Sequence, residues 1–317
     1  MQTKIATRDA YGKTLVKLGK KYQDIVVLDA DLSKSTKTAL FKGEFPDRFF
    51  NVGIAEQNLA CVAGGMSLAG KVPFASSFAM FATGRAFEMI RNSLCYPKLN
   101  VKIAATHAGI TVGEDGASHQ ANEDVAIMRA IPNMTVLVPA DAVETEQIIE
   151  AAYNYNGPVY IRLGRSGVPV LYDDNYKYQI GKASKLRDGK DVSIIAMGIM
   201  VSKALEAAEM LAEEGVQASV YNMSTIKPID VDAIEEAAQT GCVVTAEEHS
   251  IIGGLGSAVA EVLGEKCPVP LERVGIMDTF GESGKPDELL KKYGLTKENI
   301  ASAVIRVMDR KTTCHHK

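Results

Sequence analysis

The feature that most constrains the fold is a repeated alternation between short apolar runs and longer segments with helical spacing. From residue 8 to residue 22, apolar side chains recur every three or four positions, and the apolar run DIVVLDA follows. Three further pairs are FFNV before IAEQNLACVAGGMSLAG, VPFAS before SFAMFATGRAFEMIRNSL, and TVLVPA before DAVETEQIIEAAYN. Alternation of this kind predicts an α/β fold with mostly parallel sheets flanked by helices.

The alternation occurs in two sets that are separated by a stretch with neither period. Residues 166–190 are rich in glycine, tyrosine and charge, which is typical of a linker. The second set begins at DVSIIAMG and continues through VQASVYNM, CVVTAEE and LERVGIM. We therefore expect one domain over residues 1–165, a linker over 166–190 and a smaller α/β domain over 191–317. A length of 317 residues agrees with two domains of about 100 to 200 residues each.

Charge and hydropathy exclude several classes of protein. The net charge of -4 provides no basic surface for nucleic acid or for an anionic membrane. The N-terminus is polar, and no apolar run approaches the roughly 20 residues that span a bilayer. We therefore expect a cytoplasmic protein that binds neither nucleic acid nor membrane, and that holds any anionic ligand through a few local groups.

The cysteines indicate neither a disulfide framework nor a structural zinc site. Five of them are spread along the chain with no CxxC pair, a pattern typical of a reducing compartment. The tail KTTCHHK places Cys314 beside His315 and His316, and we interpret it as a frayed terminus rather than a metal site. His249, which follows CVVTAEE, is expected to pack rather than to catalyse.

Acids, histidines and arginines gather at the ends of the apolar runs of the first domain. Asp31 follows DIVVLDA, Glu56 follows FFNVGIA, and His107 ends VKIAATH. Ligands bind at the carboxyl ends of the strands in open α/β sheets, so these residues are candidates for a site. The glycine-rich loop after His107 has the composition of an active-site loop. Candidates in that loop and after the next run are Glu114, Asp115, His119, Arg162 and Arg165.

Glu56 begins a predicted helix whose other positions are nearly all small or apolar. Capping the helix N-terminus is the ordinary role of such a glutamate. The alanines and glycines that follow indicate close approach of another backbone or of a planar ligand. Phe78 and Phe81 lie one turn apart and belong either to the core or to an aromatic shelf. A phosphate loop, a nucleophile elbow and a zinc helix are all absent, and GGLGSA at Gly253 lacks the spacing of a dinucleotide fingerprint.

Three stretches, GIAEQNLACVAGG, FAMFATGRAFEMIRNS and THAGITVGEDGASHQANEDVAIMRAIPNM, resemble in this order the pyrimidine-binding and C-terminal domains of transketolase. The resemblance extends over essentially the whole chain. It implies thiamine diphosphate as the cofactor, with Glu56 bonded to a ring nitrogen of the aminopyrimidine so that its imino form is favoured. Phe78 and Phe81 would stack on that ring, with Asp31 nearby. Gly84 stands where the family has a third aromatic residue.

The resemblance also implies transfer of a two-carbon ketol unit from a ketose phosphate to an aldose phosphate. Arg165 would hold the sugar phosphate, for which a guanidinium is well suited, and Arg162 is the alternative to it. The other residues that match positions contacting phosphate are Arg8 and Ser35. Those that match positions contacting the hydroxyl and carbonyl oxygens are His107, Asp115 and His119, of which the two histidines would also assist proton transfer.

One motif of the family is missing from the chain. The family holds the cofactor diphosphate through a divalent metal and a GDG motif followed by an asparagine, and no GDG occurs here. The chain therefore resembles the C-terminal section of a split transketolase, and the resemblance implies an N-terminal-section partner that binds the diphosphate and Mg²⁺. The small-residue helix after Glu56 is then expected at a subunit interface, with self-association across the pyrimidine-binding domain and a heterotetramer as the assembly.

Two other interpretations remain open. The chain could be another thiamine-dependent half, either a beta-type subunit of a 2-oxoacid dehydrogenase or part of a deoxyxylulose phosphate synthase. His107 and the GEDGxxHQ loop favour a sugar phosphate over a free 2-oxoacid, and His107 argues against the synthase. The chain could also be a non-catalytic binding or regulatory module, against which the intact set of candidate residues argues.

Overall fold

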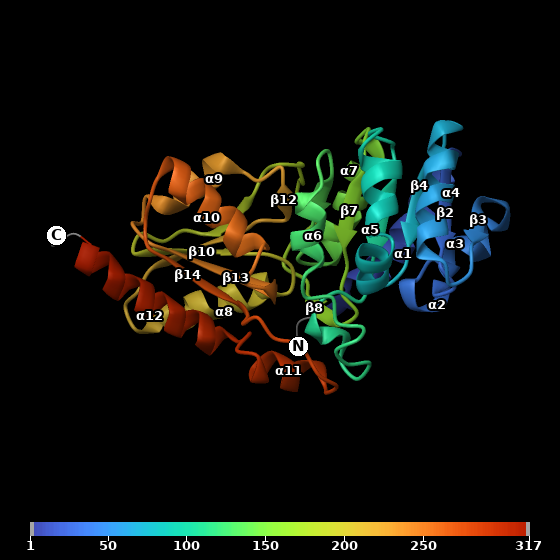
Figure 1. Ribbon diagram of the computed structural model, residues 1–317. Coiled ribbons are helices and arrows are strands. Elements are labelled where there is room, and N and C mark those ends of the chain that lie inside the picture. The colour runs from blue at the N-terminus through green and yellow to red at the C-terminus, as the bar shows by residue number, and fades with distance from the viewer. Residues whose placement is uncertain (1–2, 315–317) are drawn as a thin grey trace.

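The computed structural model describes residues 3–314 and contains two α/β units, each built around its own sheet (Figure 1). The first sheet has the strand order β12-β6-β7-β5-β4-β2-β3, and all its strands except β12 are parallel to their neighbours. The parallel strands are β2 (Ile25–Asp29), β3 (Phe49–Asn51), β4 (Val72–Ser76), β5 (Lys102–Ala105), β6 (Thr135–Leu137) and β7 (Val159–Arg162). The predicted α/β architecture is confirmed.

Helices of predicted period flank this first sheet. The buried face of α1 (Thr7–Lys21) is formed by Tyr11, Leu15 and Leu18, which are the apolar positions of the sequence pattern. It packs beside α7 (Ala142–Asn154), while the opposite face carries α4 (Glu56–Leu68) and α6 (Asp124–Ala130). The short helices α2 (Ser33–Thr36) and α3 (Ala39–Glu44) and a 3₁₀ turn at Pro46–Arg48 connect β2 to β3.

The predicted helix after β4 is not a regular α-helix. It consists of a π turn at Phe81–Arg85, the short α5 (Phe87–Met89) and a second π turn at Ile90–Cys95. A π turn closes its hydrogen bond one residue later than an α turn, so the side chains that follow it are displaced around the helix axis. Such turns are frequent at functional sites, and the first of these two begins at Phe81, one of the candidate aromatic residues.

The second unit has the strand order β14-β13-β10-β11-β9. Its strands are β9 (Ser184–Arg187), β10 (Val192–Ala196), β11 (Ala218–Asn222), β13 (Val243–Ser250) and β14 (Leu271–Ile276), all parallel except β9. Its helices are α8 (Met200–Glu213), α9 (Val231–Ala238), α10 (Leu255–Lys266), α11 (Pro286–Lys292) and α12 (Lys297–Cys314). The last two were not predicted, although Ile300, Val304 and Val307 form a buried stripe of helical period on α12.

The segment predicted as a linker contains regular structure. Within residues 166–190, β8 (Gly167–Pro169) pairs antiparallel with β1 (Lys4–Ala6), and β9 forms the edge of the second sheet. In addition, β12 (Thr225–Lys227) leaves the second unit to pair with β6 of the first sheet. Strands of three or four residues are too short to display a period, which is why the sequence pattern did not indicate them.

A buried polar network joins the two units. Arg162 Nε donates to Asp124 at 2.8 Å, and its Nη2 donates to the carbonyl of Glu248 at 2.9 Å. The Glu248 carboxylate accepts from the backbone N–H of Thr111 at 2.7 Å. His249 is fully buried in the same network and accepts from the N–H of Ala126 at 3.3 Å, which agrees with a packing role.

No helix in the described part of the chain has both the length and the apolar character needed to cross a membrane. No group of three or more metal-ligating side chains was found within residues 3–314. Cys314 ends α12, whereas His315 and His316 of the tail lie outside the described residues.

Candidate functional site

Most of the predicted site residues meet at the carboxyl edge of the first sheet, with Arg8 entering from the start of α1. Arg8 donates through Nη1 to Nε2 of His107 at 3.0 Å and to the carbonyl of Ser35 at 3.0 Å. The ring of His107 stacks on Phe78 with 3.8 Å between centroids. Phe78 in turn lies 5.8 Å from Phe81, and their ring planes are nearly parallel. Residues far apart in the sequence therefore form one continuous cluster.

His119 extends this cluster from the glycine-rich loop. Its ring meets Phe81 edge-on at 5.2 Å and Phe78 at 6.2 Å. Its Nδ1 lies 2.9 Å from the hydroxyl of Ser118. The two histidines of the loop thus border the same pair of aromatic rings, as an active-site loop requires.

His107 occupies an unusual position. It is 3% exposed, and its backbone adopts a φ of 59°, in the left-handed region that non-glycine residues seldom enter. Burial lowers the pKa of its imidazole to about 3, and the nearby charges of Arg8, Arg165, His119 and Lys37 act in the same direction. The ring is therefore neutral at physiological pH and exchanges hydrogen bonds rather than charge.

Glu56 is buried at the N-terminus of α4 with only 1% of its side chain exposed. It does not cap the helix, because both carboxylate oxygens bond to side chains of other elements. Oε1 accepts from the hydroxyl of Ser77 at 3.2 Å, and Oε2 accepts from Nη1 of Arg85 at 2.6 Å. The Arg85 guanidinium also lies over the ring of Phe81 at 4.9 Å. The carboxylate and the aromatic shelf are therefore adjacent parts of one site.

Arg85 and Lys37 were missed by reasoning from the sequence. Arg85 lies four residues after Phe81, a spacing that could have suggested contact on a helix. Lys37 ends α2 in a left-handed conformation, with φ of 71°, and pairs with Asp9 at 3.0 Å. Its charge is among those that lower the pKa of His107, so it belongs to the basic side of the cluster.

The two candidate arginines have different environments. Arg162 is 6% exposed and is saturated by Asp124 and by the carbonyls of Ala121 and Glu248. Arg165 is 35% exposed, donates to the carbonyl of Val112 at 2.5 Å and lies 3.4 Å from the carboxylate of Asp115. Arg162 is therefore part of the packing between the units, and only Arg165 can reach a ligand.

Asp31 stands apart from the cluster. It is exposed, with a φ of 66°, and accepts at 2.8 Å from the side-chain amide of Asn51. Its contacts thus join the ends of β2 and β3 rather than the groups around His107. The structure brings it to the same sheet edge without a contact to the other predicted residues.

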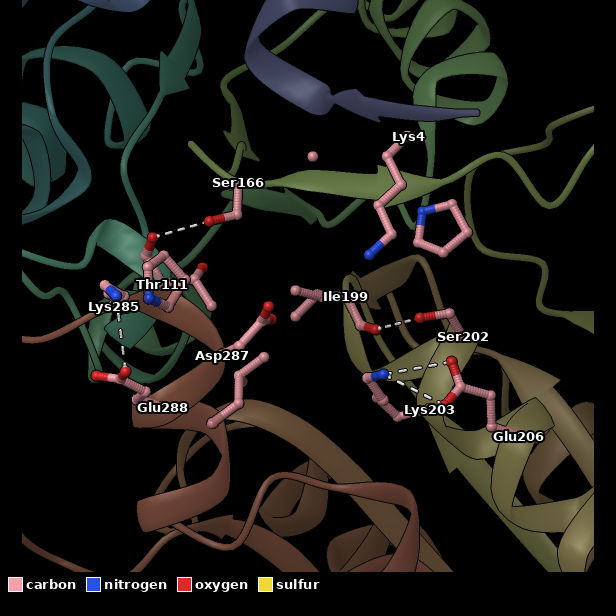
Figure 2. Close-up of a pocket in the computed structure, with 14 residues that line it drawn as sticks. Lys4, Thr111, Ser166, Ile199, Ser202, Lys203, Glu206, Lys285, Asp287 and Glu288 are labelled. Atoms are coloured by element: carbon pink, nitrogen blue, oxygen red, sulfur yellow. Dashed lines mark hydrogen bonds and ion pairs between the residues drawn. The ribbon is translucent and has the colours of Figure 1, made fainter. Parts of the chain in front are cut away.

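A cavity of about 620 Å³ lies elsewhere, between β1, β8, α8 and α11 (Figure 2). None of the predicted site residues lines it. Ser166 donates to the carbonyl of Thr111 at 3.0 Å along one wall (Figure 2). The charged side chains that line the cavity are Lys4, Lys203, Lys285, Glu206, Asp287 and Glu288, so positive and negative charges balance. The cluster around His107 is separate from this cavity.

Comparison with known proteins identifies the family. Residues 3–170 match the model of the transketolase pyrimidine-binding domain, and residues 181–300 match that of the transketolase C-terminal domain. A protein of Methanocaldococcus jannaschii named for the C-terminal section of transketolase is 55% identical over 306 residues, covering 96% of each chain. A 6-deoxy-6-sulfo-D-fructose transketolase subunit of a Clostridium species is 46% identical and covers 96% of this chain and 95% of its own.

A solved structure agrees with these relatives. A split-gene transketolase described as an inactive beta4 tetramer superposes with a TM-score of 0.91 at 60% identity, covering 97% of this chain and 99% of the other. The chain belongs to the transketolase family. The resemblance read from the sequence motifs is thereby confirmed.

Proposed function

We propose that this chain is the C-terminal-section subunit of a thiamine-diphosphate-dependent transketolase. The observation that carries the proposal is the buried carboxylate of Glu56 beside the parallel rings of Phe78 and Phe81, on the same sheet edge as the basic groups around His107. Ser77 and Arg85 hold this carboxylate in place at the edge of the aromatic rings.

The residues present fit the aminopyrimidine end of the cofactor. A flat heteroaromatic ring can stack on Phe81, which is half-buried, while Glu56 accepts a proton shared with a ring nitrogen. Thiamine diphosphate supplies the carbanion chemistry when bound, and the chain supplies orientation and proton traffic. The neutral ring of His107 and the ring of His119 border the same shelf, where they can exchange hydrogen bonds with substrate oxygens.

The basic side of the cluster suits the anionic end of a sugar phosphate. Arg8 is half-buried, and its Nε has no hydrogen-bond partner within the described part of the chain. With Arg165 and the hydroxyl of Ser35, it can hold an anion through hydrogen bonds, of which those from the guanidinium groups are charge-assisted. Asp115, which lies against Arg165, is positioned to accept from a sugar hydroxyl. The reaction is transfer of a two-carbon ketol unit from a ketose phosphate to an aldose phosphate.

The diphosphate and Mg²⁺ are assigned to an N-terminal-section partner. This chain has no GDG motif, and one relative is named for a C-terminal section while a similar solved chain is described as split-gene. The exposed side chains of Ile54, just before α4, and Leu68, its last residue, are expected of a helix that a second subunit covers. We infer self-association across this face and a heterotetramer. The four cysteines whose side chains the structure describes are free, which supports a cytoplasmic location.

Reconstitution tests this function. The chain alone, the N-terminal-section partner alone and their mixture are assayed with thiamine diphosphate, Mg²⁺, a ketose phosphate and an aldose phosphate. We expect ketol transfer from the mixture only. Full activity of this chain alone would refute the split-enzyme proposal, and decarboxylation of a 2-oxoacid by the mixture would favour the dehydrogenase-type alternative.

A further inference from the structure

We propose that Arg85 is a positioning residue that stabilises the carboxylate form of Glu56, so that the proton shared with the bound aminopyrimidine lies on the ring nitrogen. The inference rests on the proposed function, because it assigns a role toward thiamine diphosphate. It concerns a residue that lies in the stretch FAMFATGRAFEMIRNS but was not among the predicted site residues.

Arg85 forms an ion pair with the buried carboxylate of Glu56. Arg85 Nη1 lies 2.6 Å from Oε2, while the carboxylate is 1% exposed and the arginine side chain is 44% exposed. A buried carboxylate without a cation is costly, and a charge-assisted bond of this length is strong. Ser77 bonds to the other oxygen as a neutral donor at 3.2 Å. Arg85 is therefore the cation that neutralises Glu56 among the described contacts.

The backbone and the aromatic shelf fix Arg85 in this place. It ends the π turn that begins at Phe81, and its guanidinium covers the Phe81 ring at 4.9 Å from the centroid. Stacking on an aromatic face and bonding to a carboxylate are interactions that a planar guanidinium makes together and an ammonium does not. Arg85 thus contacts both the Phe81 ring and the Glu56 carboxylate.

Other charged groups on elements packed against α4 are engaged elsewhere. Asp29, at the end of β2, accepts from Thr36 at 2.6 Å and from Thr38 at 2.9 Å. Glu88 and Arg91, on the segment that contains Arg85, both bond to the side chain of Asn92. Among the charged groups that the structure describes on these elements, only Arg85 contacts the carboxylate of Glu56.

Arg85 is expected to influence where the proton shared by Glu56 and the cofactor's ring nitrogen resides. Glu56 and a ring nitrogen compete for one proton, and a cation 2.6 Å from the carboxylate favours the state in which the acid is ionised. In the assembled complex the proton would then be held on the ring nitrogen of the bound cofactor. Without Arg85, the proton shifts toward Glu56 and the ring is protonated over a narrower pH range.

The test uses the assembled complex of this chain with its partner, Mg²⁺ and thiamine diphosphate. Near-ultraviolet circular dichroism of the bound cofactor is followed from acid to alkaline pH in wild type, R85Q, R85K and the control R91Q. We expect the midpoint for loss of the ring proton to fall by about one pH unit, a tenfold change in proton affinity, in R85Q. R85K should fall between R85Q and wild type, and R91Q should match wild type.

The outcomes separate this role from a structural one. A wild-type midpoint in R85Q overturns the proposal, as does tighter cofactor binding with an unchanged midpoint, which would make Arg85 a competitor of the ring. If the R85Q complex fails to assemble, the R85K complex provides the test. A wild-type midpoint for loss of the ring proton in R85K also overturns the proposal. Absence of cofactor binding by the wild-type complex would instead refute the proposed function.

Discussion

Arg8 and His107, which are 99 residues apart in the chain, share a hydrogen bond of 3.0 Å between a guanidinium Nη1 and an imidazole Nε2. A guanidinium can only donate, so Nε2 of His107 must be the unprotonated nitrogen. The ring proton then resides on Nδ1, which lies 2.8 Å from the hydroxyl of Thr106. The pair fixes both the tautomer and the neutrality of His107 at the centre of the basic cluster.

Because His107 is neutral in the native state, we expect the free energy of unfolding to depend on pH. The pKa of His107 is lowered to about 3 in the native state by burial and neighbouring charges, while an unfolded histidine has a pKa near 6.5. Below pH 6.5 the unfolded chain binds a proton that the native chain does not, so stability falls with falling pH until the native pKa is reached. Between pH 7 and pH 5 we expect a loss of about 2 kcal/mol from this residue.

Urea unfolding of the wild type and of His107→Asn at pH 7 and pH 5 measures this contribution. The variant should lose less stability than the wild type between the two pH values, whatever its stability at pH 7. An equal loss in both chains would show that His107 is protonated alike in the native and unfolded states.

We expect substitution of Arg162 to affect mainly stability and substitution of Arg165 to affect mainly substrate binding. Arg162→Met leaves the carboxylate of Asp124 buried without its cation, which should lower the free energy of unfolding by about 3 to 5 kcal/mol. Arg165→Ala removes partly exposed contacts and should cost less than about 1 kcal/mol. In the reconstituted enzyme Arg165→Ala should raise the KM of a ketose phosphate far more than that of a non-phosphorylated donor. Equal effects on both donors would remove Arg165 from anion binding.

Glu56→Gln separates cofactor binding from proton sharing. The amide keeps the shape of the side chain and can still meet Ser77, but it cannot take up or release a proton. We expect the mixed complex to retain thiamine diphosphate while its turnover falls by two orders of magnitude or more. Cofactor retention is followed by equilibrium dialysis and turnover by ketol transfer. A rate within a factor of two of wild type would exclude Glu56 from the mechanism.

Much of this site could be predicted from the sequence, because strand and helix periods fix which residues reach the carboxyl edge of a parallel sheet. Glu56, Phe78 and His107 come within five residues of the ends of strands β3, β4 and β5, and the rings of Phe78 and His107 are in contact. The burial of Arg162 could not be predicted, since its partner Asp124 lies on a helix and its second partner Glu248 comes from the other unit.

Arg85 shows why the remaining features were not predictable. Its contact with Glu56 depends on a π turn, and no local periodicity distinguishes such a turn from an α-helix. The pairing of β12 with β6 of the first sheet was also not predictable, because a strand of three residues has no pattern from which its partner strand can be inferred. Both are decided by tertiary contacts rather than by propensity.

The last prediction concerns Gly109, in the loop that follows His107. Its φ of 77° and ψ of -176° belong to a region that only glycine adopts readily, and a Cβ there would lie 2.3 Å from the carboxylate carbon of Glu248. That carboxylate cannot easily yield, because it accepts from the N–H of Thr111 at the contact between the two units. Gly109→Ala should therefore lower the free energy of unfolding by about 3 kcal/mol or more.

Gly215→Ala is the matched control for this strain. Gly215, which follows α8, has a φ of 87° with no atom near its Cβ position, so its substitution costs only the backbone strain of about 1 to 2 kcal/mol. Because the loop of Gly109 carries His119 and Asp115, Gly109→Ala should also lower ketol transfer in the reconstituted enzyme, whereas Gly215→Ala should not. Equal destabilisation by the two substitutions would mean that the loop moves away from Glu248 without cost, and that the contact between the units does not hold the loop in place.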